Sequence, residues 1–355
     1  MPQYPKSVVR PVNKNDLPAL MNLAKLAGHG MTNLPYDESA LQEKIDTSLH
    51  SFSNDADTDL LGYNFVMEDL ASGDIIGISG ICGAGTHSMP FYHFKMSSVK
   101  YVNQDFNLVK DHRILTMVND YQGWTEICSL FIRPDFRKCY NGALMSRSRF
   151  LFMAEYPDRF NNNILAEMRG VVNPDGSQPF WDNVVSHFID MNYLDADKLT
   201  GKGIKQFIPD LMPRYPLYVE LLPQAAQDVI DKVHKDTEPA LHMLYHEGFA
   251  SHGYIDIFEA GTMVECELSK INSVRKSKQY AITELIDEKN HKQSEDDLYL
   301  ISNGKLIDFR VTIAPLIIHH ETEEVMLSHE VAKVLQVDVN EKIRFVSLKY
   351  NNGKK

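Results

Sequence analysis

The sequence feature that most constrains this chain is a short basic turn between an apolar run and an amphipathic one. The run before the turn, Thr125 to Ile132 (TEICSLFI), has the length and composition of a buried strand. The run after it, Ala143 to Tyr156 (ALMSRSRFLFMAEY), has the length of a helix. A helix that begins at this turn presents unpaired N–H groups and the positive end of its macrodipole to whatever lies in front of it. We therefore expect the turn to bind an anion, and we interpret that anion as a diphosphate.

The residues of the turn, Phe136 to Leu144 (FRKCYNGAL), fit this interpretation. Arg137 and Lys138 bring positive charge, and Gly142 lets the backbone come close to an anion. Basic turns before helices are common, however, and most of them are only solvated. On the residues alone, a solvated turn is the alternative interpretation.

Composition narrows the class of protein. Of the 355 residues, 43% are hydrophobic and 24% are charged, which is typical of a folded chain with one large domain or two ordinary ones. The net charge of −12 argues against a nucleic-acid partner and is compatible with a cationic substrate. The four cysteines form no CxxC pair, and the sequence lacks both a signal-peptide core and an apolar run of about 20 residues. We therefore predict a cytoplasmic protein in a reducing environment, without a membrane partner.

The pattern up to the turn predicts alternating strands and helices. Val8 to Val12 reads as a strand, residues 15–28 and 36–52 read as helices, and residues 62–83 read as two strands around a turn. Thr86 to Gly123 is predicted to be less regular.

The pattern after the turn is also mixed. We expect a strand at Ile164 to Val172, helical structure over Pro179 to Leu199, and a helix over Gln224 to Val233 that ends at His234. A further helix is predicted over Thr237 to Phe249, where Thr237 is the cap.

The residue pattern in the last part of the chain predicts strands. Asp287 to Asp297 is a charged segment that we expect to be an exposed excursion. Beyond it, Asn303-Gly304 is a hairpin signal.

The order of these elements resembles that of the Gcn5-related N-acetyltransferase superfamily. In that superfamily a turn of the form Arg/Gln-x-x-Gly-x-Gly/Ala, after the fourth strand, cradles the pyrophosphate of an acyl-CoA. The turn of this chain matches at Arg137 and Gly142, whereas Tyr140 stands where a glycine is expected. Tyr140 must either avoid a positive φ or accept a cost of about 1 kcal/mol. A second signature of the superfamily, on a later helix, is matched by Ala240, Leu244, Tyr245, Gly248 and Phe249.

Additional motifs, from Val9 through the tail, resemble the arginine N-succinyltransferase family. They include LTMVNDYQG, EICSLFIRPDFRK, AEMRGV, FIPDLMPRYPLY and VHKDTEPA. The resemblance implies an α/β fold with a mixed central sheet flanked by helices. It implies an acyl-CoA N-acyltransferase domain over residues 1–270, with an insertion at about 158–232, and a small β-rich region over residues 271–355. The implied reaction transfers succinyl from succinyl-CoA to the α-amine of L-arginine, without a metal, as the first step of arginine catabolism by the succinyltransferase pathway.

The resemblance also implies catalytic residues. The family assigns a proton donor to the histidine of VHKDTEPA, which is His234, whereas a lone histidine at a helix end is by default a dipole partner. The wider superfamily makes Tyr245 a rival donor, although a tyrosine at helical spacing is more often packing. Glu126 occupies the position of the superfamily's general base, and Glu167 is the second candidate. Either carboxylate could instead pair with a nearby arginine.

The ligands need partners of defined chemistry. The family places Leu130 against succinyl-CoA, and we interpret this contact as one made by its backbone. The predicted cofactor-binding residues are Leu130, Phe131, Ile132, Arg137, Lys138, Asn141, Gly142 and Ala143. A guanidinium requires a carboxylate, for which Asp120, Asp182 and Asp256 are candidates, and a succinyl carboxylate requires a donor such as Arg169 or Arg113. The predicted substrate-binding residues are Asp120, Glu167 and Arg169.

Two alternatives are kept beside this interpretation. Ornithine could replace arginine as the acceptor, because some relatives accept it. The chain could also be a non-catalytic partner subunit, which Tyr140 favours and His234 argues against. In either case we expect a homo-oligomer, or a hetero-oligomer with a related subunit.

Overall fold

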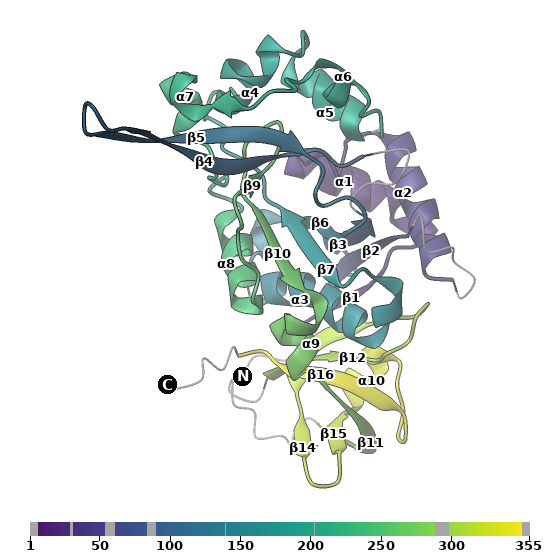
Figure 1. Cartoon of the computed structure of the whole chain (residues 1–355). Helices are drawn as coiled ribbons and strands as arrows, with labels where there is room; N and C mark the ends of the chain where they lie inside the picture. The colour runs from purple at the N-terminus through teal and green to yellow at the C-terminus, as the bar shows by residue number, and fades with distance from the viewer. Residues whose placement is uncertain are drawn as a thin grey trace.

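The computed structural model describes residues 6–28, 31–53, 61–83, 90–138, 140–201, 203–287 and 298–349 (Figure 1). A twelve-stranded mixed sheet runs through the molecule. Its first six strands along the chain are β1 (Ser7–Pro11), β2 (Gly62–Asp69), β3 (Ile75–Gly83), β6 (Thr125–Ile132), β7 (Asn163–Glu167) and β10 (Met263–Glu267). The remaining six are β11 (Lys278–Ile286), β12 (Leu298–Ser302), β13 (Val311–Pro315), β14 (Ile317–His319), β15 (Glu324–Ser328) and β16 (Lys342–Ser347). The strand order is β10-β7-β6-β3-β2-β1-β13-β12-β16-β11-β15-β14.

Helices cover both faces of this sheet, so the predicted α/β class is confirmed. The main helices are α1 (Leu17–Ala27), α2 (Glu38–Ser51), α3 (Asn141–Glu155), α8 (Glu238–Glu247), α9 (Asn272–Lys276) and α10 (His329–Leu335). Because successive side chains of a strand point to opposite faces, β2 serves two cores: Phe65 and Met67 belong to the cluster around α3, and Val66 packs with α1 and α2. Among the described helices, none has the length and apolar content needed to cross a membrane.

The helix α3 is buried almost completely, because the strands of the C-terminal region extend the same sheet that α3 packs against. Arg147 of α3 is buried and forms an ion pair with Glu247 at 3.0 Å between Nε and Oε1. Its guanidinium also donates to the carbonyl oxygens of Ser347 and Leu348 at 3.0 and 2.9 Å. Since a buried charge needs such partners, this network joins α3 and α8 to the end of the chain.

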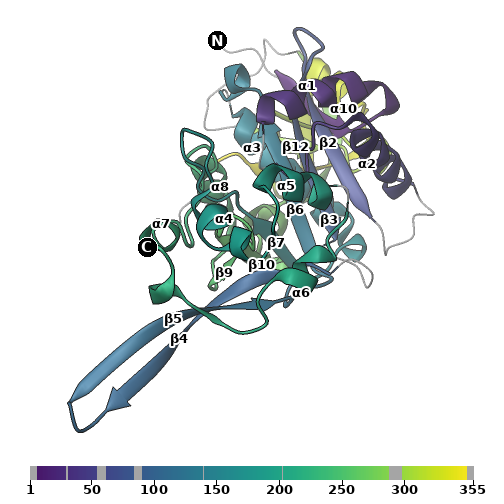
Figure 2. The same ribbon diagram turned by 90° about the horizontal axis from the view of Figure 1, so that it is seen from above.

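A long hairpin replaces the less regular stretch that the sequence predicts over Thr86 to Gly123. Its strands, β4 (His93–Asn103) and β5 (Leu108–Val118), pair over their whole length and project from the body (Figures 1 and 2). With β8 (Leu217–Tyr218) and β9 (Tyr254–Ile255) they form a second sheet. The prediction was wrong because most of this hairpin is exposed on both faces, so its strands lack the usual alternation of apolar and polar residues.

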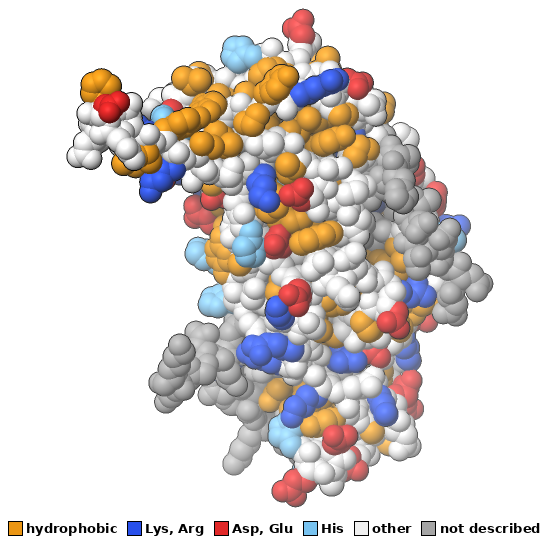
Figure 3. Space-filling model, viewed as in Figure 1, with side chains coloured by type: hydrophobic (Ala, Val, Ile, Leu, Met, Phe, Trp, Pro, Cys, Tyr) orange, Lys and Arg blue, Asp and Glu red, His pale blue; other side chains and the backbone are white. Residues whose placement is uncertain are grey.

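The tip of the hairpin carries exposed apolar side chains. Phe106 is 81% exposed, and Leu108 and Val109 are 48% and 56% exposed. Hydrophobic side chains also gather along the hairpin and over the helices next to it, on the face that Figure 3 shows. Exposed apolar surface of this kind is typical of contact sites.

The insertion forms short helices around a second core, which it shares with the hairpin and with the segment around β9; this core includes Trp181 and Phe258. The helices are α4 (Pro179–Asn183), α5 (Tyr193–Gly201), α6 (Phe207–Leu211) and α7 (Gln224–Gln227). The predicted helical run over Pro179 to Leu199 is therefore broken between α4 and α5. The predicted helix over Gln224 to Val233 is wrong beyond its first turn, because Asp231 has a positive φ of 62° and its N–H donates to the Ala260 oxygen at 3.0 Å.

The C-terminal hairpin is confirmed, but its connection is longer than the sequence predicts. Strands β12 and β13 are antiparallel neighbours, joined by residues 303–310 instead of a two-residue turn. Asn303 holds this loop: its side-chain amide donates to the Asp308 oxygen at 2.7 Å, and its side-chain oxygen accepts from the Arg310 N–H at 3.0 Å. Most of the predicted excursion, residues 288–297, lies outside the described residues.

Candidate active site

A cavity opens where the neighbouring strands β6 and β7 separate. The two strands pair in parallel at Thr125–Ile164 and Glu126–Leu165, and the ladder between them ends there. The cavity has a volume of about 370 Å³ and is lined by Glu126 to Phe131 of β6 and by residues 166–169 after the pairing on β7. Because the strands no longer pair, backbone N–H and C=O groups of β6 become available to a ligand.

A β-bulge in β6 lies beside this cavity. Ser129 has a φ of 55°, and the register against β3 shifts between the pairs Ile78–Phe131 and Gly80–Cys128. The Ser129 hydroxyl donates to the Asn33 oxygen at 3.0 Å, which holds the bulge against the loop that follows α1. A bulge redirects the backbone groups next to it, and the adjacent residue Leu130 lines the cavity.

The basic turn leads directly into α3. Arg137 lines the cavity, and its Nε donates to the Ile132 oxygen at 3.1 Å. Tyr140, the residue before α3, adopts the left-handed conformation at φ 65° and ψ 9°. The expected glycine-like geometry is therefore present, and Tyr140 accepts its cost, which is about 1 kcal/mol.

The other predicted turn residues have separate roles. Asn141 is buried and fixes the turn, since its side-chain amide donates to the Phe136 oxygen at 3.0 Å. Gly142 and Ala143 belong to the first turn of α3, whose N–H groups have no partner within the helix. Lys138 is exposed, and Ile132 is part of the core cluster.

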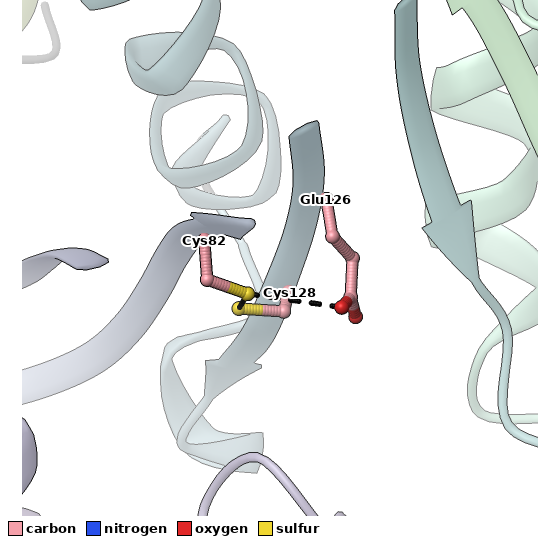
Figure 4. A group of neighbouring side chains, drawn as sticks. All are labelled: Cys82, Glu126 and Cys128. Carbon is pink, nitrogen blue, oxygen red and sulfur yellow. Dashed lines mark hydrogen bonds between the residues drawn. The ribbon is translucent and has the colours of Figure 1, made fainter. Parts of the chain in front are cut away.

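Glu126 lies at the point where β6 and β7 separate. Its side chain is buried, Asn33 Nδ2 lies 3.3 Å from Oε1, and Cys82 Sγ lies 3.7 Å from Oε2 (Figure 4). Burial raises the pKa of Glu126 to about 7, and the negative charge of Cys128 adds to this effect. A carboxyl group with this pKa is suited to take a proton near neutral pH.

Further carboxylates line the same cavity, together with cationic side chains; the four carboxylates belong to Glu167, Asp236, Asp256 and Glu259. Burial raises the pKa of Glu259 to about 7, and it also raises the pKa of Asp256. Glu167 keeps access to solvent through the cavity, but the surrounding protein and the Asp256 carboxylate raise its pKa well above the usual range. Lys205 and Arg169 supply the positive charge on this wall.

The backbone at Gly170 lies very close to Glu259, one of the residues that line the cavity. The Gly170 N–H donates to Glu259 Oε2 at 2.8 Å. A Cβ at position 170 would lie 2.3 Å from the backbone carbonyl oxygen of Glu259. Only glycine fits such an approach, which explains the glycine of the AEMRG motif in physical terms.

His234 lies beside the cavity. The backbone N–H of His234 donates to the backbone oxygen of Arg169 at 2.8 Å. Asp236 and Thr237, which follow His234 in the chain, line the cavity. Its Nδ1 accepts the Asp236 N–H at 3.2 Å, so the neutral ring carries its proton on Nε2. Burial and the charge of Arg169 lower the pKa of His234. In the neutral ring, Nε2–H is therefore the available donor.

Several predicted residues lie outside the cavity. Tyr245 is 43% exposed, whereas α8 contributes Ala240 and Leu244 to the lining. Asp120 accepts from the Tyr254 hydroxyl at 2.8 Å and contacts Lys95. Asp182 accepts from the Gln178 N–H near the start of α4, and Arg113 lies on the hairpin beside Glu220.

Sequence reasoning did not select Lys205, Asn33, Cys82 or Cys128 as site residues. Lys205 and Asn33 lie in loops without a local signal. Cys82 and Cys128 are 46 residues apart and form no CxxC pair, so only the register of β3 against β6 brings them together.

The splayed strands, the bulge and the turn before α3 together define the fold of a Gcn5-related N-acyltransferase. Comparisons with known proteins agree. The family described as arginine N-succinyltransferase beta subunit matches residues 7–273, and its C-terminal domain matches residues 283–347. The arginine N-succinyltransferase subunit beta of Pseudomonas aeruginosa is 41% identical over 87% of this chain and 89% of its own. The arginine N-succinyltransferase of Escherichia coli is 37% identical over 96% of this chain and 97% of its own.

A solved structure is also similar along the whole chain. Subunit AI of the arginine/ornithine succinyltransferase from Pseudomonas aeruginosa superimposes with a TM-score of 0.85 at 32% identity, covering 97% of this chain and 99% of its own. The chain belongs to the arginine N-succinyltransferase family.

Proposed function

We propose that this protein transfers the succinyl group of succinyl-CoA to the α-amine of L-arginine. The observation that carries the proposal is the cavity between β6 and β7, which has a basic turn with Arg137 at its β6 end and four carboxylates on its other walls. Such a cavity suits an anionic acyl-CoA and a cationic acceptor. The names of the relatives from Escherichia coli and Pseudomonas aeruginosa support the choice of substrates.

The acyl-CoA occupies the β6 side in this proposal. Its diphosphate binds the N–H groups of Gly142 and Ala143 at the start of α3, with Arg137 as the nearby cation. The pantetheine arm follows the unpaired backbone of β6 near Leu130, and the thioester reaches Glu126. Backbone N–H groups of the splayed strand then donate to the oxyanion that forms during acyl transfer.

The acceptor and the succinyl carboxylate occupy the β7 side. Glu167 and Asp256 offer carboxylate oxygens to a guanidinium. Arg169 is suited to the succinyl carboxylate, because its Nε is buried and has no hydrogen-bond partner among the described residues. Lys205 adds a second positive charge on the same wall.

The chemical step needs two protons to leave the attacking nitrogen. Glu126 accepts the first from the α-ammonium group, which frees the amine to attack the thioester carbon. When the tetrahedral intermediate collapses, the bond from carbon to sulfur breaks. His234 donates a hydrogen bond through Nε2–H to the departing sulfur, whose thiol has a pKa of about 8.5. After Glu126 has passed the first proton to solvent, it accepts the second from the nitrogen, and the released CoA thiolate takes its proton from solvent.

Three expectations stay predictions. The location in the cytoplasm and the boundary between domains near residue 270 are expectations from sequence. Assembly into an oligomer is another, and the apolar tip of the hairpin is the described surface that suits it.

Release of CoA tests the proposed function. The purified protein is mixed with succinyl-CoA and a thiol reagent, and arginine, ornithine or buffer is added. We expect thiol release that depends on arginine and a product whose α-nitrogen carries the succinyl group. Release with ornithine alone would change the acceptor, and absence of release with both would favour the non-catalytic subunit.

A further inference from the structure

Two cysteines and a glutamate converge on one face of the sheet. Cys82 of β3 is paired directly with Glu126 of β6, and Cys128 is two residues further along β6. Side chains of directly paired residues, and of residues two apart on one strand, point to the same face. The register therefore forces the three side chains together, as Figure 4 shows.

The distances within this group match the edges of a tetrahedral metal site. The Sγ atoms of Cys82 and Cys128 lie 3.5 Å apart, and Cys82 Sγ lies 3.7 Å from Glu126 Oε2. All three ligand atoms lie within 4.8 Å of one another. A tetrahedral zinc ion, with Zn–S of about 2.3 Å and Zn–O of about 2.1 Å, would separate two sulfurs by about 3.8 Å and a sulfur from an oxygen by about 3.6 Å. Small rotations of the side chains would therefore suffice to close the site.

The surroundings also favour a cation held by thiolates. Asn33 lies beside Oε1 of Glu126, so Oε2 is the oxygen turned toward the sulfurs. This is the outer-shell arrangement that orients a ligating carboxylate. Arg149 donates to the Cys128 oxygen at 3.4 Å, and Lys44 interacts with Cys128 electrostatically. These cations offset the negative charge that remains when two thiolates and a carboxylate bind one divalent ion.

We propose that Cys82, Cys128 and Glu126 form a three-ligand site for zinc, with the fourth position open to the cavity. Thiolates select zinc over magnesium or calcium, because they are soft ligands. The ion acts as a reversible inhibitor and not as a cofactor of the transfer. Ligation occupies the Glu126 carboxylate and places a cation where the α-ammonium group of the acceptor would sit. This inhibitory effect rests on the proposed function, whereas zinc binding itself does not.

The binding test uses the full chain after treatment with a phosphine reductant and removal of metals. Zinc is titrated by calorimetry, and cobalt(II) is titrated as a spectroscopic substitute. We expect one zinc ion per chain and, with cobalt, a near-ultraviolet charge-transfer band from thiolate to metal. Cys82→Ser and Cys128→Ser should each weaken zinc binding by at least about 10-fold, because each removes a ligand. Cys266→Ser is the matched control and should bind zinc like the parent.

Each possible result either supports or overturns the zinc site. Binding that is unchanged in Cys82→Ser and Cys128→Ser, or lost in Cys266→Ser, would overturn it. So would a parent protein that shows no thiolate band with cobalt, a result that does not depend on the folding of any variant. Conversion of the pair to a disulfide, with no zinc uptake by the reduced protein, would reassign the pair to redox chemistry. Zinc binding without loss of CoA release would uphold the site and count against Glu126 as the base.

Discussion

Replacement of His234 by alanine is expected to lower kcat by about 10²- to 10⁴-fold, while the Kd for CoA stays within about two-fold of the parent. The reason is that His234 donates to a sulfur that becomes negative only as the thioester breaks, so its contribution appears in the transition state. Steady-state kinetics and calorimetric CoA binding measure the two quantities separately.

Two companion variants sharpen this result. His234→Gln keeps an N–H donor without an imidazole, so it should recover part of the activity if the group donates a hydrogen bond. His242→Ala is the matched control, because His242 is an exposed histidine on α8. Equal losses of kcat and CoA affinity in His234→Ala would indicate that the residue only shapes the loop that lines the cavity.

Glu126→Gln is expected to have an effect of similar size, about 10²- to 10⁴-fold on kcat. The substitution preserves the shape of the side chain and its contact with Asn33, but an amide cannot accept the proton of the α-ammonium group. Glu126 is preferred to Glu167 as the base because it lies where β6 and β7 separate, between the β6 backbone and the part of the cavity proposed to hold the acceptor.

Glu167→Gln separates the two candidates for the base. If Glu167 binds the guanidinium, its loss should raise the KM for arginine about 10-fold and change kcat much less. The assignments would have to be exchanged if Glu167→Gln abolished turnover and Glu126→Gln raised only the KM. Both variants should bind CoA like the parent, because neither residue lies at the start of α3.

The parts of the site that could be predicted from sequence are those built from local structure. The strand β6, the basic turn and the start of α3 at Asn141 follow from residues that are close together in the chain. The positive φ of Tyr140 is one of the two conformations that the sequence allows. Gly170 is explained only by the structure, because the group that excludes a Cβ there belongs to Glu259.

The parts that could not be predicted depend on long-range pairing or on the absence of a core. The hairpin of β4 and β5 has few buried positions, so its sequence carries a weak strand pattern. The C-terminal strands join the main sheet through the pair β1–β13, in which Val9 faces Val311. Similarly, Glu167 and Asp256 line the same cavity although they are far apart in the chain, and no spacing in the sequence indicates that they lie together.

A crystal structure with bound succinyl-CoA would test the central claim most directly. We predict density for the diphosphate at the N–H groups of Gly142 and Ala143, beside the Arg137 guanidinium, with the thioester between β6 and β7 near Glu126. Nucleotide density elsewhere on the protein, with the start of α3 occupied only by solvent, would contradict the account.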